Sequence, residues 1–163
     1  GGYVPGDPST DNGTVIQDAL QIWHDTGVAG HTIAAFAELS NLSWPKLKQC
    51  LYLFGTVHLG INCPQSALDQ FNMGSPVWTY RAGSPIAGGH AIPLQKVTPY
   101  TGQKGILSIV TWGEPIRMTT KFASEYIEEA WVVLTHDWVA QNGNDIDGFS
   151  YAQLQADFNA INS

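Results

Sequence analysis

A histidine that follows two glycines is the strongest candidate for chemistry in this chain of 163 residues. Gly88 and Gly89 precede His90, and Ala91 and Ile92 continue into a predicted strand. Because glycine has no side chain, this spacing places the imidazole at an exposed strand end with room for a ligand beside it. An imidazole in that position can act as a general base at neutral pH.

Three more residues are expected near that imidazole. Thr111 and Trp112 end a later predicted strand. Trp78 lies in a long irregular segment, where it is expected to form part of a groove wall or a protein interface. Together with Gly88 and Gly89, these residues are predicted to border a cleft.

The two cysteines of the chain are the candidate nucleophiles. Residues 65–71 could begin a helix directly after Cys63, and a helix N-terminus would activate that thiol. The alternation of Leu59, Ile61 and Cys63 predicts instead a small apolar residue on a buried strand face, which is the interpretation we prefer. Cys50 lies on the apolar face of a predicted helix and is expected in the core.

Composition and spacing exclude several other classes of function. Seven Lys and Arg face fourteen Asp and Glu, which gives a formal net charge of −7 and argues against nucleic-acid binding. No apolar run approaches the roughly 18 residues that a membrane span needs. The histidines show no zinc-ligand spacing, and two cysteines cannot form a four-thiolate site, so no metal is expected.

The positions of glycine, proline and apolar residues predict an α+β fold with a mainly antiparallel sheet and flanking helices. Helices are expected at residues 10–27, at 43–55, near 120 and from 150 onward. Strands are expected at residues 31–39, 56–62, 90–97, 106–112 and 130–135. Thr10 or Asp11 can cap the first helix, while Pro45 suits the first turn of the second and Gly55 its end. Residues 64–89 are expected to be irregular.

The histidine segment resembles the papain-like cysteine peptidase superfamily. In that family a Gly-His-Ala-Val strand carries the catalytic histidine, and a strand with Asn-Ser-Trp-Gly follows it. Residues 89–92 (GHAI) and 109–113 (IVTWG) are similar to those two strands. The resemblance implies further counterparts in helix 44–54, strand 57–61, strand 130–133 and the helical segment 10–27. In closer detail, the chain resembles an uncharacterised group of papain-like proteins from bacteria and their phages.

The resemblance implies that His90 is the catalytic base and that no cofactor takes part. The family's nucleophilic cysteine caps a long helix well before the histidine, and no such helix is predicted here. The position of the asparagine that orients the histidine is occupied by Val110, which cannot accept a hydrogen bond. Thr111 is expected to point to the other face of its strand.

Two functions remain as hypotheses. The favoured one is a non-catalytic structural or binding module on a papain-like scaffold, placed in a phage or cell-surface assembly by a protein partner or by self-assembly. The alternative is the C-terminal part of a papain-like cysteine peptidase, with His90 as general base and the thiol on an upstream segment. In both cases residues 1–163 are expected to form a single papain-like domain that lacks the N-terminal nucleophile helix.

Overall fold

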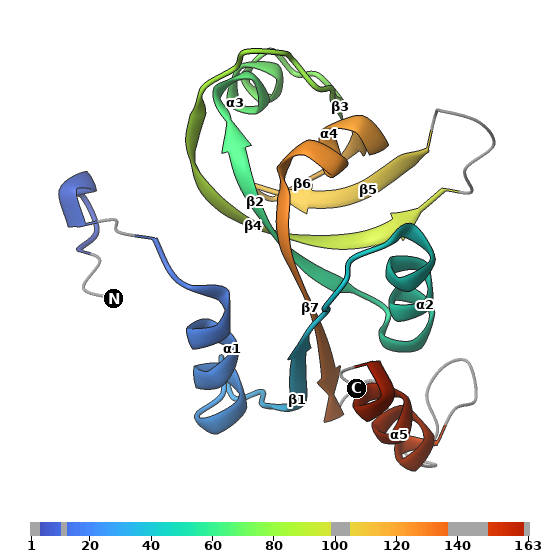
Figure 1. Ribbon diagram of the computed structural model, residues 1–163. Coiled ribbons are helices and arrows are strands. Elements are labelled where there is room, and N and C mark those ends of the chain that lie inside the picture. Colours follow the sequence, from blue (N-terminus) through green and yellow to red (C-terminus); the bar gives the residue numbers. More distant parts are fainter. Residues whose placement is uncertain (1–3, 11–12, 99–104, 137–149, 162–163) are drawn as a thin grey trace.

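The computed structural model describes residues 4–10, 13–98, 105–136 and 150–161. These residues form an α+β fold around a seven-stranded sheet with the order β1-β7-β2-β4-β5-β6-β3 (Figure 1). The strands are β1 (Ile33–Glu38), β2 (Val57–Pro64), β3 (Val77–Trp78), β4 (Ile86–Val97), β5 (Ile106–Thr111), β6 (Glu114–Thr119) and β7 (Ile127–Thr135). The helices are α1 (Ile16–Asp25), α2 (Trp44–Phe54), α3 (Gln65–Asn72), α4 (Thr120–Tyr126) and α5 (Tyr151–Ile161), preceded by the short 3₁₀ turn η1 (Pro8–Thr10).

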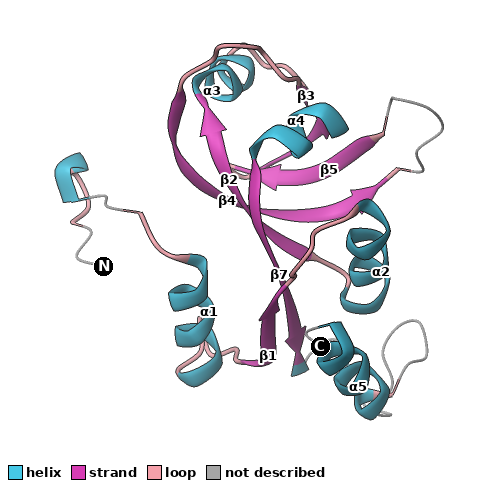
Figure 2. Ribbon diagram, viewed as in Figure 1, coloured by secondary structure: helices cyan, strands magenta, loops and turns pink. Residues whose placement is uncertain are grey.

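The predicted α+β class is confirmed. Neighbouring strands are antiparallel except β3 and β6, which pair in parallel and make the sheet mixed. Helices lie at both ends of the strongly curved sheet, as Figure 2 shows. Within the part of the chain that the structure describes, no helix is long and apolar enough to cross a membrane.

Local signals place α2 as expected. The Ser43 side chain accepts a hydrogen bond from the backbone N–H of Lys46, and Pro45 occupies the first turn, where a missing N–H costs nothing. Gly55 ends the helix in the left-handed conformation with a φ of 73°, which glycine adopts at little cost.

The predicted start of the first helix is wrong. The helix begins at Ile16, after Val15, and has no side-chain cap. Thr10 instead belongs to η1, where its hydroxyl donates to the carbonyl of Asp7 at 2.8 Å. The apolar spacing predicts the body of the helix, whereas Thr10 belongs to a separate turn and Asp11 lies outside the described residues.

The segment predicted to be irregular contains α3 and β3, and β4 begins already at Ile86. The buried Gln70 holds this segment together. Its side-chain amide donates to the carbonyls of Ser66 and Thr79 at 2.8 and 3.1 Å. Its side-chain oxygen accepts from the N–H and hydroxyl of Thr79 at 2.9 and 2.8 Å. The segment is ordered by hydrogen bonds between two residues nine positions apart, Gln70 and Thr79, so no local periodicity of the sequence predicts it.

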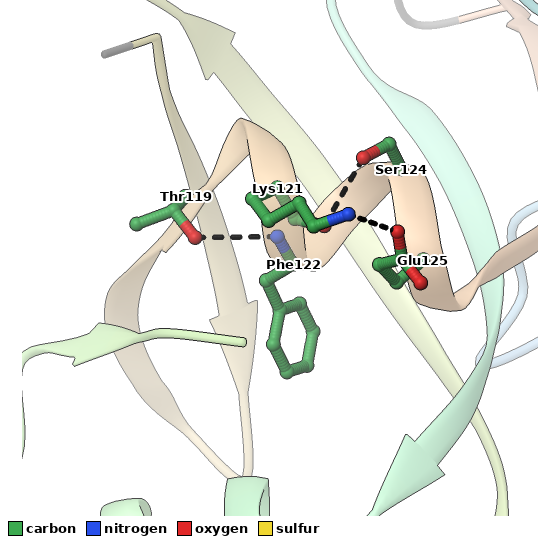
Figure 3. A network of polar contacts seen from close by, with 5 residues as sticks. All are labelled: Thr119, Lys121, Phe122, Ser124 and Glu125. Atoms are coloured by element: carbon green, nitrogen blue, oxygen red, sulfur yellow. Dashed lines mark hydrogen bonds and ion pairs between the residues drawn. The ribbon is translucent and has the colours of Figure 1, made fainter. Parts of the chain in front are cut away.

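Helix α4 anchors one end of the core. The Thr119 hydroxyl accepts from the N–H of Phe122 at 3.2 Å, the Ser124 hydroxyl donates to the carbonyl of Lys121, and Lys121 pairs with Glu125 (Figure 3). The Phe122 ring points away from these surface contacts, and it is fully buried. The cap thereby fixes a large apolar side chain beneath the sheet.

Candidate functional site

His90 lies in β4 on the buried face of the sheet. It is opposite Ile61 of β2 and shares its face with Ile92 and Leu94, which are buried. Its Nε2 atom is 2.7 Å from the hydroxyl oxygen of Thr111, at the end of β5. The histidine is therefore held by a second strand.

The expectation that Thr111 points away from the histidine is wrong. Leu107, Ile109 and Thr111 alternate along β5 as buried residues, and Thr111 is only 3% exposed. Val110 occupies the other face. In the resembled motif the asparagine occupies the position of Val110. Here the hydroxyl of the next residue, Thr111, contacts the His90 ring instead.

Trp112 covers this hydrogen bond. Its indole stacks on the His90 ring with centroids 4.6 Å apart and planes 16° apart. Its backbone has a φ of 46°, and Gly113 follows with a φ of 81°, so the two residues form the tight turn between β5 and β6. A left-handed conformation is unfavourable for a bulky residue, and the ring contacts with His90 and Phe71 hold it there.

Trp78 does not form a groove wall or an interface, because it is fully buried. It packs under Trp112, with centroids 5.8 Å apart, and against Phe122 at 5.3 Å. Its indole N–H has no hydrogen-bond partner among the described residues. Trp78 therefore supports the ring that covers the histidine.

The His90 ring is half-buried, and this desolvation lowers its pKa below the ordinary value of 6.5. The neutral form is thus favoured at neutral pH. The Nε2 atom meets Thr111, while Nδ1 has no hydrogen-bond partner within the described ranges. In the tautomer that donates from Nε2 to the threonine hydroxyl, Nδ1 carries the lone pair that a general base uses.

Neither cysteine has the environment of an activated nucleophile. Burial raises the pKa of the Cys63 thiol to about 11, and the pKa of Cys50 to about 11 as well. Helix α3 does begin shortly after Cys63, but the thiol is 3% exposed and its sulfur lies 3.9 Å from the carbonyl of Pro64. Both cysteines are free and buried, which favours the core interpretation.

Gly88 and Gly89 leave open space beside the histidine. Both are exposed, and a Cβ atom added to either would meet nothing within 4 Å. They border a groove that runs between α1 and the outer face of β2 and β4 and reaches His90. Among the described residues that line this groove, the carboxylates are Asp18, Glu128 and Glu129, and there is no Lys or Arg.

The described residues contain no group of three His, Cys, Asp or Glu side chains that could hold a metal ion. Three supporting residues were missed by sequence reasoning, namely Gln70, Phe71 and Phe122. The alternation of apolar residues from Leu107 onward was the one signal that could have placed Thr111 on the buried face.

Comparisons with models of protein families, with curated proteins and with solved structures give no match to this chain.

Proposed function

We propose that this chain is the histidine-bearing part of a papain-like cysteine peptidase or a related acyl-transfer enzyme. The observation that carries the proposal is the hydrogen bond between His90 and Thr111, 2.7 Å long and covered by Trp112. A core histidine needs no such arrangement of one bonded nitrogen, one free nitrogen and open space beside it. A general base does need it, because its ring must be fixed while one nitrogen stays available.

Each residue has a distinct role in the proposed reaction. Nδ1 of His90 accepts the proton of a cysteine thiol, and the thiolate attacks the substrate carbonyl. The protonated ring then donates that proton to the leaving group, which leaves an acyl-thioester for water to hydrolyse. Thr111 takes the positioning role that asparagine has in the resembled family, and Trp112 excludes water from its hydrogen bond with the ring.

The thiol comes from a segment outside residues 1–163 in this proposal, since the two cysteines of the sequence, Cys50 and Cys63, are both buried. That segment has to approach the ring on the face of the sheet that carries Ile92 and Thr111, which is opposite to the groove beside α1.

The test uses the protein as isolated from its source, together with everything that co-purifies. An epoxide probe that alkylates activated thiols is applied, and the labelled peptide is identified by mass spectrometry. We expect one labelled cysteine outside residues 1–163, with Cys50 and Cys63 unlabelled. In the His90→Ala variant labelling falls at least about tenfold, because the base contributes 10²- to 10⁴-fold in typical enzymes. Equal labelling in both proteins, or no labelling in either, rejects the proposal.

The second candidate is a non-catalytic binding module on a papain-like scaffold, as in a phage or cell-surface assembly. The observation that favours it is the burial of both thiols, each with a pKa of about 11. It predicts that the protein binds its partner equally well as wild type and as the His90→Ala variant, and that no thiol probe reacts. A loss of partner binding on thiol modification contradicts it.

A further inference from the structure

The first half of β4 has a partner strand on one side only. Strand β2 pairs with β4 from Ile86 to Leu94, whereas β5 pairs with it only from Leu94 to Val97. Strand β5 ends at Thr111, where the chain turns back into β6. Among the described residues, no strand pairs with residues 86–93 on the side opposite β2.

The hydrogen bonds of the sheet show which backbone groups face this free side. The N–H of Leu39 donates to the carbonyl of Ala130 at 2.8 Å, so the backbone N–H and C=O groups of Ala130 point to β1. The backbone groups of successive residues in a strand point alternately to the two neighbouring strands. Those of Trp131 therefore point to β2, where Trp131 is opposite His58. The backbone groups of His58 accordingly point to β7.

The same alternation extends to β4. Ile61 lies three positions after His58, so its backbone groups point to β4, where Ile61 is opposite His90. His90 faces β2 in return, so the N–H and C=O groups of Gly89 and Ala91 point to the free side. Pro93 has the same orientation, and a proline is tolerated there because it has no N–H to pair.

The surroundings of this edge leave it open. Residues 86–89 and Ala91 are exposed, and Ile86 is 51% exposed. Neither Gly88 nor Gly89 has an atom within 4 Å of a Cβ position, although their side-chain directions lie on opposite faces of the sheet. At Gly88 and Gly89 the strand is therefore uncovered on both faces.

Pro93, at the end of this edge near β5, is its one feature of the kind that keeps proteins from pairing edge to edge. Residues 86–92 (IAGGHAI) contain no charged residue and no proline. Exposed strand edges of this kind are templates for another extended chain, and natural proteins normally block them with lysine, proline or a covering segment. Before Pro93 the edge therefore offers exposed small residues without a blocking side chain, which is what a strand-addition site requires.

We infer that the free edge of β4 at Gly89 and Ala91 binds an extended polypeptide segment, which adds to the sheet where β5 has turned away. The two residues offer two N–H donors and two C=O acceptors to the backbone of that segment. Because β4 carries glycines here, recognition rests on backbone groups and tolerates many side chains. The inference goes beyond the proposed function and needs no thiol, since binding can be measured without catalysis.

The test is amide hydrogen exchange, measured by NMR on the ¹⁵N-labelled chain. The probe is the neutral peptide acetyl-Gln-Thr-Val-Thr-Val-Thr-Gln-amide, and the control has the same side chains with alternate backbone nitrogens methylated. At about nine times its Kd the probe leaves about a tenth of the sites free, so exchange at Gly89 and Ala91 slows about tenfold. The amides of Gly88 and His90, which face β2, serve as internal references.

A second arm changes the protein. Ala91→Pro removes one outward N–H without removing a bond to β2, and it is expected to weaken probe binding at least about fivefold. Ala91→Ser keeps the N–H and is expected to bind as wild type. Thermal unfolding shows whether each variant is folded, and the methylated control peptide tests the inference even if the proline variant is not.

Three results overturn the inference. The first is unchanged exchange at Gly89 and Ala91 with the probe in excess. The second is equal protection by the methylated control, which would mean that side chains and not backbone groups are recognised. The third is protection of the same amides without peptide together with a concentration-dependent dimer in light scattering, which would assign the edge to a second copy of the chain. None of these results bears on thiol labelling, so the proposed function is tested separately.

Discussion

Replacing Thr111 with valine removes the hydroxyl that holds His90 while keeping the shape of the side chain. Thr111 is 3% exposed and its hydroxyl lies 2.7 Å from Nε2, so the variant loses one hydrogen bond in a closed site. A typical intramolecular hydrogen bond contributes about 0.5–1.5 kcal/mol to the free energy of unfolding. His90 is half-buried and can turn toward water, so we expect a loss of about 1 kcal/mol, or about 2–4 °C in Tm.

The same variant reports on the histidine itself. The hydroxyl accepts from the imidazolium as well as from the neutral ring, so its removal lowers the pKa of His90 further below the ordinary value of 6.5. The ¹⁵N shifts of the ring also lose the separation that one preferred tautomer produces. Both effects are measured by NMR titration of the ring, next to urea unfolding for stability.

The matched control is Thr111→Ser, which keeps the hydroxyl and loses one methyl group. We expect the serine variant to retain the wild-type ring shifts and pKa, even where the missing methyl group reduces its stability. If the valine variant also retains them, the hydrogen bond does not hold the ring, and the reasoning about His90 as a positioned base is refuted.

Three further variants test other parts of the structure. Trp112→Ala uncovers the His90 ring, so its pKa should rise back toward 6.5 in an NMR titration, and an unchanged value would contradict the role of Trp112 as its cover. Burial lowers the pKa of His58, so the unfolded chain binds its proton first and stability falls as the pH drops below about 6.5, by at most about 1.4 kcal/mol per pH unit. His58→Phe should reduce the slope of the urea-unfolding profile between pH 7.5 and 5 while the contribution of His90 remains, and an equal slope would count against it. Gln70→Ala leaves the backbone groups of Thr79 without partners and should cost about 2–4 kcal/mol in urea unfolding, whereas the exposed control Gln65→Ala should cost under about 0.5 kcal/mol.

Several elements could be predicted from the sequence because their causes are local. Ser43, Pro45 and Gly55 define the ends of α2 through interactions within a few residues. The alternation of Val57, Leu59 and Ile61 predicted β2, since period-two burial is a property of any strand that covers a core. The α+β class followed from the order of such elements.

The candidate site depended on contacts that only the tertiary structure makes. His90 was found from its own sequence, because two glycines beside a histidine are visible in the chain. Its partner Thr111 lies 21 residues away on another strand, and the face it occupies is decided by where β5 enters the sheet. The burial of Trp78 likewise depends on α4, which packs Phe122 against it.

The free edge of β4 shows the same division. The sequence by itself determined that residues 86–92, apart from His90, are small or apolar, and that the stretch contains no Asp, Glu, Lys or Arg. Only the assembled sheet decided that β5 stops at Thr111 and leaves Gly89 and Ala91 without a neighbour on that side. The physical reason is that side-chain patterns report which face of an element is buried, whereas partners, register and the length of each pairing depend on how distant elements pack together.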